Sequence, residues 1–209
     1  MYTGITRGSF PIVELEERAS ATRLTVELSE ELAEGIELGA SISIDGVCLT
    51  VAAVQDNYVS FDAIDETRKL TTLGELTLGR NVSVERSAKL GDELGGHDVY
   101  GHVIGTGSVL AREERGVQLD LTIGVPAQWM KYILHKGFIA LDGSSLTVDT
   151  DGTRDQNSFK VHLIPETLRL TTFAGKQPGD RINVELDAKT VAIVDTVERV
   201  LAERLAQSS

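Results

Sequence analysis

The chain of 209 residues contains two copies of one sequence, and this repeat constrains the fold more than any other feature. Residues 42–51 read ISIDGVCLTV and residues 139–148 read IALDGSSLTV, which places Asp45 and Asp142 97 positions apart. Farther along, DETRKLTT returns as PETLRLTT at a separation of 100. Repetition of this kind means that one structural unit occurs twice. The change from 97 to 100 predicts a three-residue insertion in the second copy, within the turn-forming segment TDGTRDQNS.

Each copy has the pattern of short β-strands. The segments SISID, NYVSFDA, NVSVE, FKVHL and INVEL alternate apolar and polar residues and are bounded by turn-forming residues. The Asp-Asn pair in VQDNYVSF predicts a hairpin. Several such strands in about 95 residues fit a small closed barrel or a sandwich, and closure is favoured because it leaves no unpaired edge. We therefore predict an all-β fold with two tandem barrels, at residues 1–97 and 98–187.

Residues 188–209 lie outside the repeat and have helical periodicity. Apolar residues recur with helical spacing, and charged residues lie on the opposite face; the apolar positions are Val191, Val194, Val197, Leu201 and Leu205. Two interpretations are open. The helix either docks on its own barrel or packs against copies of itself in an oligomer.

Composition argues against several classes of protein. A net charge of -12 and a pI near 4.8 disfavour binding to nucleic acid. No apolar run approaches the roughly 20 residues needed to cross a bilayer, and the start MYTGITRGSF lacks the apolar segment of a secretory signal. The single cysteine, Cys48, excludes an internal disulfide and is typical of a reducing compartment. We therefore expect a cytoplasmic protein without membrane association.

The two Asp-Gly turns are candidate binding loops. DGVCLT and DGSSLT each present a thiol or hydroxyl, backbone amides and a threonine hydroxyl, which suit a heterocyclic or polyhydroxylated ligand. The alternative is that they serve structure alone. Cys48 aligns with Ser145, so a soft nucleophile occurs in one copy only. A lone cysteine is, however, more often a small buried apolar residue.

Histidines and one carboxylate are further candidates. His97 and His102 flank GHDVYGH, a spacing that predicts opposite faces of a strand and does not match metal-ligand spacing. No further ligands complete a structural zinc site, so no metal is expected. His102 at a barrel mouth could shuttle protons, and His135 and His162 are weaker candidates. Asp187 aligns with Ser87 and either orients a base or a neighbouring chain, or is a solvated turn residue.

Seven segments together carry a resemblance to a known family. They occur in uninterrupted order from residue 1 to about 204: MYTGI, SIDGVCLTV, FDAIDETRKLTTLG, GGHDVYGH, KYILHKGFIALDGSSLTV, HLIPETL and VDTVERVL. They resemble the riboflavin synthases of the alpha-subunit type. The resemblance implies a homotrimer in which each chain has two six-stranded Greek-key barrels and a C-terminal oligomerisation helix at residues 188–209.

The resemblance also implies a reaction. One molecule of 6,7-dimethyl-8-ribityllumazine transfers a four-carbon unit to a second, which gives 5-amino-6-(D-ribitylamino)uracil from the donor and riboflavin from the acceptor, without metal or cofactor. The implied active site joins the N-terminal barrel of one subunit to the C-terminal barrel of its neighbour. Association with lumazine synthase is a further expectation.

Site residues follow from the matching motifs. The first pocket would be formed by Gly4, Ile5, Thr6, Ser41, Cys48, Leu49, Thr50, Asp62, Ala63, Ile64, Asp65, Glu66 and Thr67. The second pocket would be formed by Gly101, His102, Val103, Lys136, Ser145, Leu146, Thr147, Leu163, Ile164, Pro165, Glu166, Thr167 and Leu168. The residues implicated in catalysis would be Tyr2, Cys48, His102, Ser145, Thr147 and Asp187.

The chain departs from the family pattern at Tyr2, Tyr100 and Ile104, where Phe, Ser and often Asp are usual. The Tyr2 hydroxyl is expected where two ligand rings stack, and the other two changes would reshape the mouth of the second pocket. The main alternative is a non-catalytic relative, the fluorescent lumazine protein of luminous bacteria, which binds a lumazine or flavin. Retention of DGSSLTV, HLIPETL and His102 favours the enzyme over that protein. A third alternative is an acidic oligomeric scaffold without a ligand.

Overall fold

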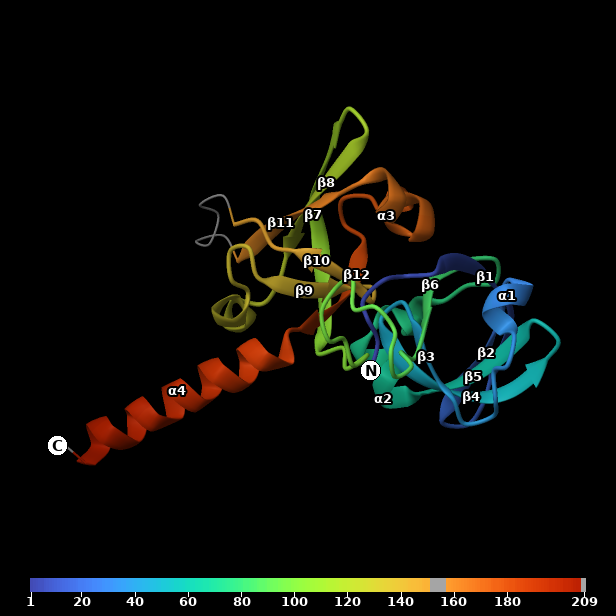
Figure 1. Cartoon of the computed structure of the whole chain (residues 1–209), viewed down its shortest axis with the longest axis horizontal. Helices are drawn as coiled ribbons and strands as arrows, with labels where there is room; N and C mark the ends of the chain where they lie inside the picture. Colours follow the sequence, from blue (N-terminus) through green and yellow to red (C-terminus); the bar gives the residue numbers. More distant parts are fainter. Residues whose placement is uncertain (151–156, 208–209) are drawn as a thin grey trace.

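The computed structural model describes residues 1–150 and 157–207, which form two β-units and one long C-terminal helix (Figure 1). The elements of the first repeat are β1 (Gly8–Glu17), β2 (Ala21–Glu27), α1 (Glu30–Ala33), β3 (Ser41–Ile44), β4 (Val47–Gln55), β5 (Tyr58–Ile64), α2 (Asp65–Leu70), η1 (Thr72–Glu75) and β6 (Asn81–Arg86). Those of the second are β7 (Gly105–Arg115), β8 (Gln118–Gly124), η2 (Ala127–Tyr132), β9 (Phe138–Leu141), β10 (Ser144–Thr147), β11 (Ser158–Leu163), α3 (Pro165–Leu170), η4 (Phe173–Gly175) and β12 (Arg181–Leu186), followed by α4 (Ala188–Gln207).

The first repeat is a closed six-stranded barrel with the strand order β1-β2-β5-β4-β3-β6. Alternate residues of each strand point inward, so Val59, Phe61 and Ala63 of β5 are buried while the residues between them face outward. The expected hairpin joins β4 to β5, and Asp56 occupies its turn at φ 54°. Closure leaves this barrel without a free edge.

The second repeat has the same ring of strands, in the order β10-β9-β12-β7-β8-β11. Its two end strands are joined beyond β10 by a single bridge, in which Asp149 and Lys160 exchange backbone hydrogen bonds of 2.8 and 2.7 Å. The expected insertion falls within residues 150–158, and 151–156 lie outside the described residues. The predicted architecture of two β-repeats and a C-terminal helix is confirmed.

Short segments exchange between the two repeats. Residues 2–6 precede the first barrel, yet the Thr6 hydroxyl lies 2.8 Å from the Ser144 hydroxyl of the second. Residues 99–103 precede the second unit, yet Val103 packs in the hydrophobic core of the first. The two segments also pair with each other, through an antiparallel bridge between Tyr2 and Val99. The N-terminus therefore lies at the junction of the two units (Figure 1).

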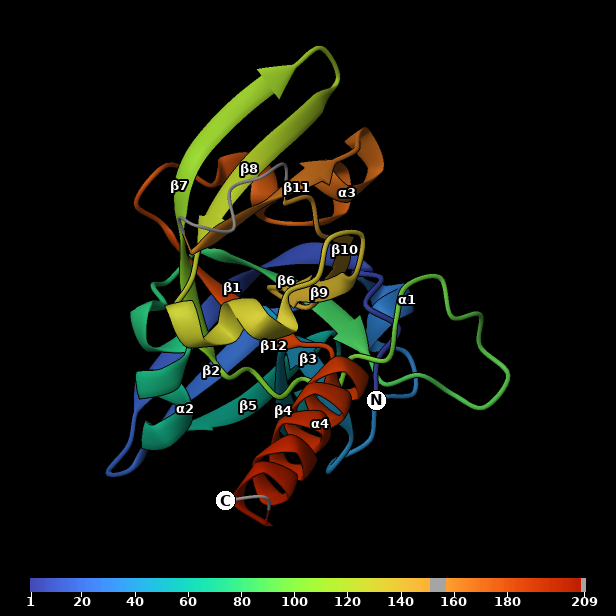
Figure 2. The ribbon, with the colours of Figure 1, turned by 90° about the vertical axis from the view of Figure 1, so that its left-hand side faces the viewer.

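Helix α4 leaves the second unit and projects away from both (Figure 1, Figure 2). Its first turns dock on η2, where Lys131 forms ion pairs with Asp195 and Glu198 and Val191 packs against the second core. Farther along, apolar side chains are exposed, and these are Ile193, Val197, Val200, Leu201 and Leu205. Docking on its own unit therefore accounts only for the start of the helix. No helix among residues 1–150 and 157–207 is long and apolar enough to cross a membrane.

Candidate functional site

Cys48 and Ser145 occupy equivalent outward-facing positions on β4 and β10. In both strands the neighbours on either side are buried, and Cys48 and Ser145 are themselves half-buried. Each follows a turn in which Asp45 or Asp142 has a positive φ, at 45° and 41°. The Asp-Gly turns therefore do serve structure, and they also aim the thiol and the hydroxyl at the junction between the repeats.

The thiol of Cys48 is covered by residues 99–103 and by Tyr2. The Cys48 backbone N–H donates to the Gly101 carbonyl at 3.1 Å, and a Cβ on Gly101 would lie 2.5 Å from the Cys48 Cβ. The Tyr2 hydroxyl donates to Cys48 Sγ at 3.1 Å, and Tyr2 itself is fully buried. Burial also raises the pKa of the Tyr2 phenol. The hydroxyl thus packs on the Cys48 thiol, and its position relative to stacked ligand rings stays a prediction.

Ser145 is covered in the equivalent way by residues 2–6. Its backbone N–H donates to the Gly4 carbonyl at 2.8 Å, and a Cβ on Gly4 would lie 2.5 Å from the Ser145 Cβ. Its hydroxyl has a partner that Cys48 lacks, because His97 Nδ1 lies 2.6 Å from Ser145 Oγ. The two positions thus share a backbone frame and differ in their polar groups.

These contacts correct the grouping of the two pockets. Residues 4–6 were assigned to the first pocket, but Gly4 and Thr6 contact β10 of the second repeat. Residues 101–103 were assigned to the second pocket, but Gly101 and Val103 contact the first repeat. The physical reason is that each leading segment crosses the junction. Motif order along the chain does not reveal such a crossing.

Two buried glutamates hold the crossing segments in place. Glu85 accepts hydrogen bonds from the backbone and the hydroxyl of Thr3, both at 2.7 Å. Glu185 accepts from the backbone N–H groups of Tyr100, Gly101 and His102, at 2.7 to 3.1 Å. Burial raises the pKa of both carboxyl groups. Sequence reasoning missed these residues, although their recurrence in NVSVE and INVEL could have identified them as a pair.

Most remaining residues of the first set lie on the outer face and rim of the barrel, and two face its core. Asp62 of β5 forms a two-pronged ion pair with Arg23 of β2, at 2.8 and 2.6 Å, and the Arg23 guanidinium lowers the pKa of that carboxyl. Ile64 is 53% exposed, and residues 65–67 begin α2 beside it. Ser41 accepts a hydrogen bond from the Ser87 hydroxyl through its carbonyl. Leu49 and Ala63 face the core, so only their backbone could contact a ligand.

In the second set, the equivalent range begins one residue earlier than expected. Asp62 pairs with Arg23 across β5 and β2, and His162 pairs with Asp120 across β11 and β8 in the same place. The side chain of Leu163 is fully buried in the core, and Leu168 packs against that core from its edge. Counted by this repeat, the residues equivalent to 62–67 are 162–167, so the range Leu163–Leu168 is offset by one from the first set and stays a prediction. The separation of 100 already placed His162 opposite Asp62, and this signal was not used.

His162 is held between two carboxylates. Its Nδ1 lies 2.7 Å from Asp120 Oδ1, and its Nε2 lies 2.9 Å from Asp149 Oδ2. Hydrogen bonding to Asp120, and then to Asp149, raises the pKa of the imidazole. The first repeat has the opposite arrangement, because there the carboxylate is on β5 and the cation on β2. This is a second difference between the two surfaces.

Replacing Asp120 with Asn should lower the pKa of His162, because Asp120 supplies its strongest partner for the charged form. NMR titration of the imidazole would measure the change. Asp56→Asn, in a turn of the first repeat, is the matched control and should leave the titration unchanged. An unaltered His162 titration in Asp120→Asn would mean that Asp149 alone sets the protonation of this side chain.

Other candidate residues are placed as follows. His97 and His102 lie on a loop that touches strand pairing only at Val99, so the expected strand with opposite faces is wrong. His102 is exposed and stacks on Tyr100, with ring centroids 6.0 Å apart. Thr50 and Thr147 are equivalent exposed residues on β4 and β10, whereas the side chain of Leu146 faces the core. Lys136 is exposed, and its backbone has a φ of 59°, a left-handed conformation that residues other than glycine rarely adopt.

Asp187 caps α4. Its Oδ2 accepts from the backbone N–H and the hydroxyl of Thr190, at 2.9 and 2.6 Å. Burial opposes ionisation of Asp187, but the hydrogen bonds from Thr190 prevail and lower its pKa. The carboxylate is therefore ionised and faces the region of His97, where it partly opposes the burial that lowers the pKa of the imidazole. It is more than a solvated turn residue, and its role in catalysis stays a prediction.

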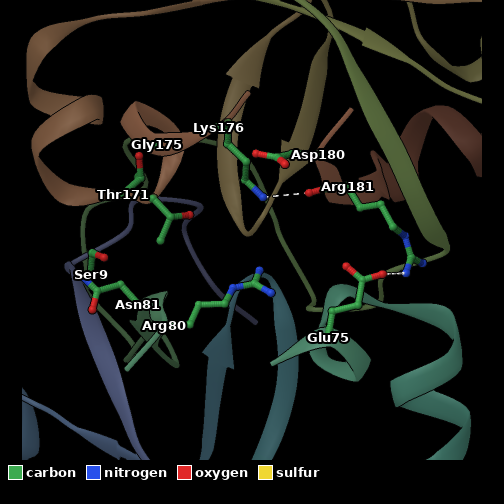
Figure 3. A pocket seen from close by; sticks show the side chains of 10 residues that line it. Ser9, Glu75, Arg80, Asn81, Thr171, Gly175, Lys176, Asp180 and Arg181 are labelled. Atoms are coloured by element: carbon green, nitrogen blue, oxygen red, sulfur yellow. Dashed lines mark hydrogen bonds and ion pairs between the residues drawn. The ribbon is translucent and has the colours of Figure 1, made fainter. Parts of the chain in front are cut away.

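A separate cavity of about 500 Å³ lies between the two repeats (Figure 3). It is lined by Ser9, Glu75, Arg80, Asn81, Thr171, Thr172, Gly175, Lys176, Asp180 and Arg181, none of which belongs to the predicted site. Lys176 reaches from its wall to the buried Asp142 at 2.8 Å, and Arg80 lies 3.6 Å from the buried Asp45. Burial and the nearby Asp142 raise the pKa of Asp45 to about 7. Each of these two ion pairs lies within one repeat, and the ion pair of Arg181 with Glu75 joins the second repeat to the first across the cavity.

No group of three or more His, Cys, Asp or Glu side chains that could hold a metal ion occurs in the described part of the chain. The polar atoms at Cys48 and Ser145 are a thiol, hydroxyls, an imidazole and backbone groups. This set can hydrogen-bond a heterocycle and can exchange protons with it.

Comparison with known proteins places the chain among lumazine-binding proteins. The family described as "Lumazine binding domain" matches residues 3–87 and 100–187. A riboflavin synthase of Escherichia coli (strain K12) is 46% identical over 206 residues, which cover 98% of this chain and 95% of the relative. A riboflavin synthase of Buchnera aphidicola subsp. Baizongia pistaciae is 41% identical and covers 96% of this chain and 94% of its own length.

The fold is also shared with solved structures. The crystal structure of LumP complexed with riboflavin superimposes with a TM-score of 0.81 at 24% identity, covering 90% of this chain and 100% of that one. LumP complexed with 6,7-dimethyl-8-(1'-D-ribityl) lumazine gives a TM-score of 0.78 at 22% identity, with 90% and 99% covered.

Proposed function

The chain belongs to the riboflavin synthase family, and from that premise we propose that the surfaces around Cys48 and Ser145 each bind one 6,7-dimethyl-8-ribityllumazine. The riboflavin synthase activity of the family transfers a four-carbon unit between these two molecules, giving riboflavin and 5-amino-6-(D-ribitylamino)uracil. We infer lumazine-binding units at residues 1–97 and 98–187, each completed by the leading segment of the other. Helix α4, within residues 188–209, serves oligomerisation.

The observation that carries this proposal is that the surfaces around Cys48 and Ser145 share the same backbone contacts and differ in their polar side chains. The reaction starts from two identical molecules and must treat them differently, since one becomes a carbon nucleophile and the other an acceptor. Equivalent backbone contacts at Cys48 and Ser145 explain how both surfaces take the same ligand. Tyr2 beside Cys48 and His97 beside Ser145 give the two ligands different neighbours.

Each surface binds and orients one ring system. On the acceptor, a nucleophile adds to a ring carbon. On the donor, loss of a proton from a ring methyl group leaves the carbanion that attacks. Holding the two rings face to face converts a bimolecular step into one within a complex, and this contributes most of the rate. Cys48, His102, Ser145, Thr147 and Asp187 are the groups proposed to move or hold protons at this interface.

We infer that the working form is a homotrimer. The two surfaces are open, since the equivalent residues Ile64 and Ile164 beside them are 53% and 59% exposed. A neighbouring chain placed over them would exclude water from the reacting rings. The exposed apolar stripe of α4 supplies a surface on which such chains can assemble. Cytoplasmic location and association with lumazine synthase stay predictions.

The direct test is turnover. Purified protein incubated with 6,7-dimethyl-8-ribityllumazine should deplete it and form riboflavin, with one riboflavin for every two lumazines consumed, as followed by chromatography. A ligand that binds, fluoresces and is recovered unchanged would instead assign the chain to the non-catalytic class. If the protein neither binds nor converts the lumazine, the remaining interpretation is an oligomeric scaffold without a ligand.

Cys48→Ser should lower turnover about tenfold while ligand binding is retained, because the change removes thiolate chemistry and little volume. The Tyr2 hydroxyl can still donate to a serine at this position, so the local frame is preserved. Fluorescence titration measures binding, and steady-state kinetics measure turnover. If Cys48 only packs, the variant will lose about 1 kcal/mol of stability or less and keep its rate.

Ser145→Cys is the reciprocal variant. It places a thiol on both surfaces and should also lower turnover, because it weakens the bond to His97. If Ser145→Cys raises turnover while Cys48→Ser leaves it unchanged, the roles assigned to the two repeats are reversed.

A further inference from the structure

We propose that His97 is a positioning residue that fixes the hydroxyl of Ser145 toward the ligand of the second surface. The inference rests on the proposed function, since it assumes that Ser145 contacts a lumazine. Neither composition nor the family motifs singled out His97 for this role. The structure does so through a side chain that is buried, immobilised and aimed at one atom.

The imidazole is fixed on several sides. Its Nδ1 lies 2.6 Å from Ser145 Oγ, and only 8% of the residue is exposed. Its ring stacks on Phe138 with centroids 5.1 Å apart and an angle of 14° between the planes. The preceding Gly96 packs so closely that a Cβ there would lie 2.3 Å from the Thr3 carbonyl and 2.9 Å from Ser145 Oγ. The loop therefore holds His97 against Ser145 with little freedom to turn away.

Burial also determines the protonation state. It lowers the pKa of His97, and although Asp187 and Asp98 oppose this shift, the imidazole is neutral near pH 7. Lys189, which pairs with Asp98 at 2.7 Å, is the cation facing the same ring. A neutral imidazole carries one proton, on either Nδ1 or Nε2.

The surroundings favour the proton on Nδ1. Nε2 is buried and has no hydrogen-bond partner among the described residues. A buried N–H without a partner is more costly than a buried lone pair without one. With Nδ1–H donating to Ser145 Oγ, the hydroxyl must direct its own hydrogen elsewhere. Ser145 therefore presents a hydrogen-bond donor to the ligand rather than satisfying the histidine.

The first surface lacks this device. There the Tyr2 hydroxyl donates to Cys48 Sγ at 3.1 Å, and the donor is a buried phenol that does not change its charge between pH 5 and 9. The two ligands would thus meet a thiol held by a phenol and a hydroxyl held by an imidazole.

Four variants test the role of His97, and each is assayed for kcat, KM and thermal unfolding. His97→Ala should lower kcat about tenfold, the scale of one lost hydrogen bond that matters in the transition state. His97→Asn should keep kcat within about threefold, because its amide N–H can occupy the place of Nδ1–H. Ser145→Ala should lower kcat by the same factor as His97→Ala. The double variant His97→Ala with Ser145→Ala should have a kcat no lower than that of Ser145→Ala alone. Leu94→Ala, an exposed side chain in the same loop, is the control.

Rescue by His97→Asn is the readout that packing alone would not give, because the amide N–H replaces the donor and the imidazole ring is lost. Additive losses in the double variant, or equal losses in His97→Asn and His97→Ala, would overturn the proposal.

A failure of the proposed function can be told apart from a failure of this inference. The tautomer of His97 is visible by ¹⁵N NMR without any substrate, and Ser145→Ala should shift its Nδ1 signal. A protein that makes no riboflavin but shows this shift would refute the function and retain the His97–Ser145 pair. An Nε2-protonated His97 would refute the inference whatever the turnover.

Discussion

A protein that lacks residues 190–209 should sediment as a monomer and should lose at least 100-fold of its riboflavin synthase activity. The side chains of Ile193, Val197, Leu201 and Leu205 are mostly exposed within one chain, so losing them should cost the barrels little stability. Losing Val191 and the ion pairs of Lys131, which dock α4 on the second unit, should destabilise that unit modestly. Ligand binding to each surface should survive. Activity should not, because the proposed site needs two chains to close over the paired rings. Analytical ultracentrifugation and lumazine titration would measure the two properties.

A point variant separates loss of the stripe from loss of the helix. Leu201→Glu places a charge in the exposed apolar stripe and should also give monomers, whereas Glu203→Gln, on the charged face, should leave the assembly intact. A truncated protein that remains trimeric would show that α4 is not the organiser. Monomers with full activity would show that one chain contains a complete site.

Lys176→Leu should destabilise the protein by about 3 kcal/mol or more at pH 8, because it leaves the buried Asp142 without its cation. The change copies the first repeat, where the equivalent residue is Leu76. Asp45 adds to the effect, since Lys176 lowers the pKa that burial has raised to about 7. Urea unfolding at several pH values would measure the free energy of unfolding.

The loss should be smaller at pH 5 than at pH 8. A carboxyl whose pKa is raised in the folded state contributes stability that is fully present below its unfolded pKa, 3.8. That contribution is lost as pH rises through about 7, and more completely when Lys176 is absent. The double variant Lys176→Leu with Asp142→Asn should recover most of the stability, because the amide oxygen can still accept from the Asn183 N–H. A loss independent of pH would mean that Lys176 acts through packing.

The fold was predictable because its signals are local. Alternation in segments such as NYVSFDA sets which residues face the core, and the repeat shows that the same unit occurs twice. The helical period of residues 188–207 likewise predicted α4. The crossing of residues 2–6 and 99–103 was not predictable, since those segments are irregular and contact residues far along the chain.

Prediction of the site met the same limit. Cys48, Ser145 and their strands follow from the repeat. The pairing of Ser145 with His97 does not, because it joins a loop to a strand 48 positions away. His162 could have been predicted from the sequence, because it lies 100 positions after Asp62 and is therefore the equivalent residue of the second repeat. Asp187 was judged from spacing alone, which cannot reveal that its carboxylate caps a helix.

The crossing of the leading segments has a consequence for how the chain is made. Residues 2–6 leave the ribosome first, but the partner of Gly4 is Ser145, 141 residues later. The first barrel in turn waits for Val103 to fill its core. Contacts so distant in sequence slow folding, because the chain loses the entropy of closing a long loop before the contacts can stabilise it. Tyr2 and Thr3 find Val99 and Glu85 near mid-chain, but Gly4 and Thr6 lack their partners through two thirds of synthesis. A bulky tag fused before the fully buried Tyr2 would compete with this last step of folding.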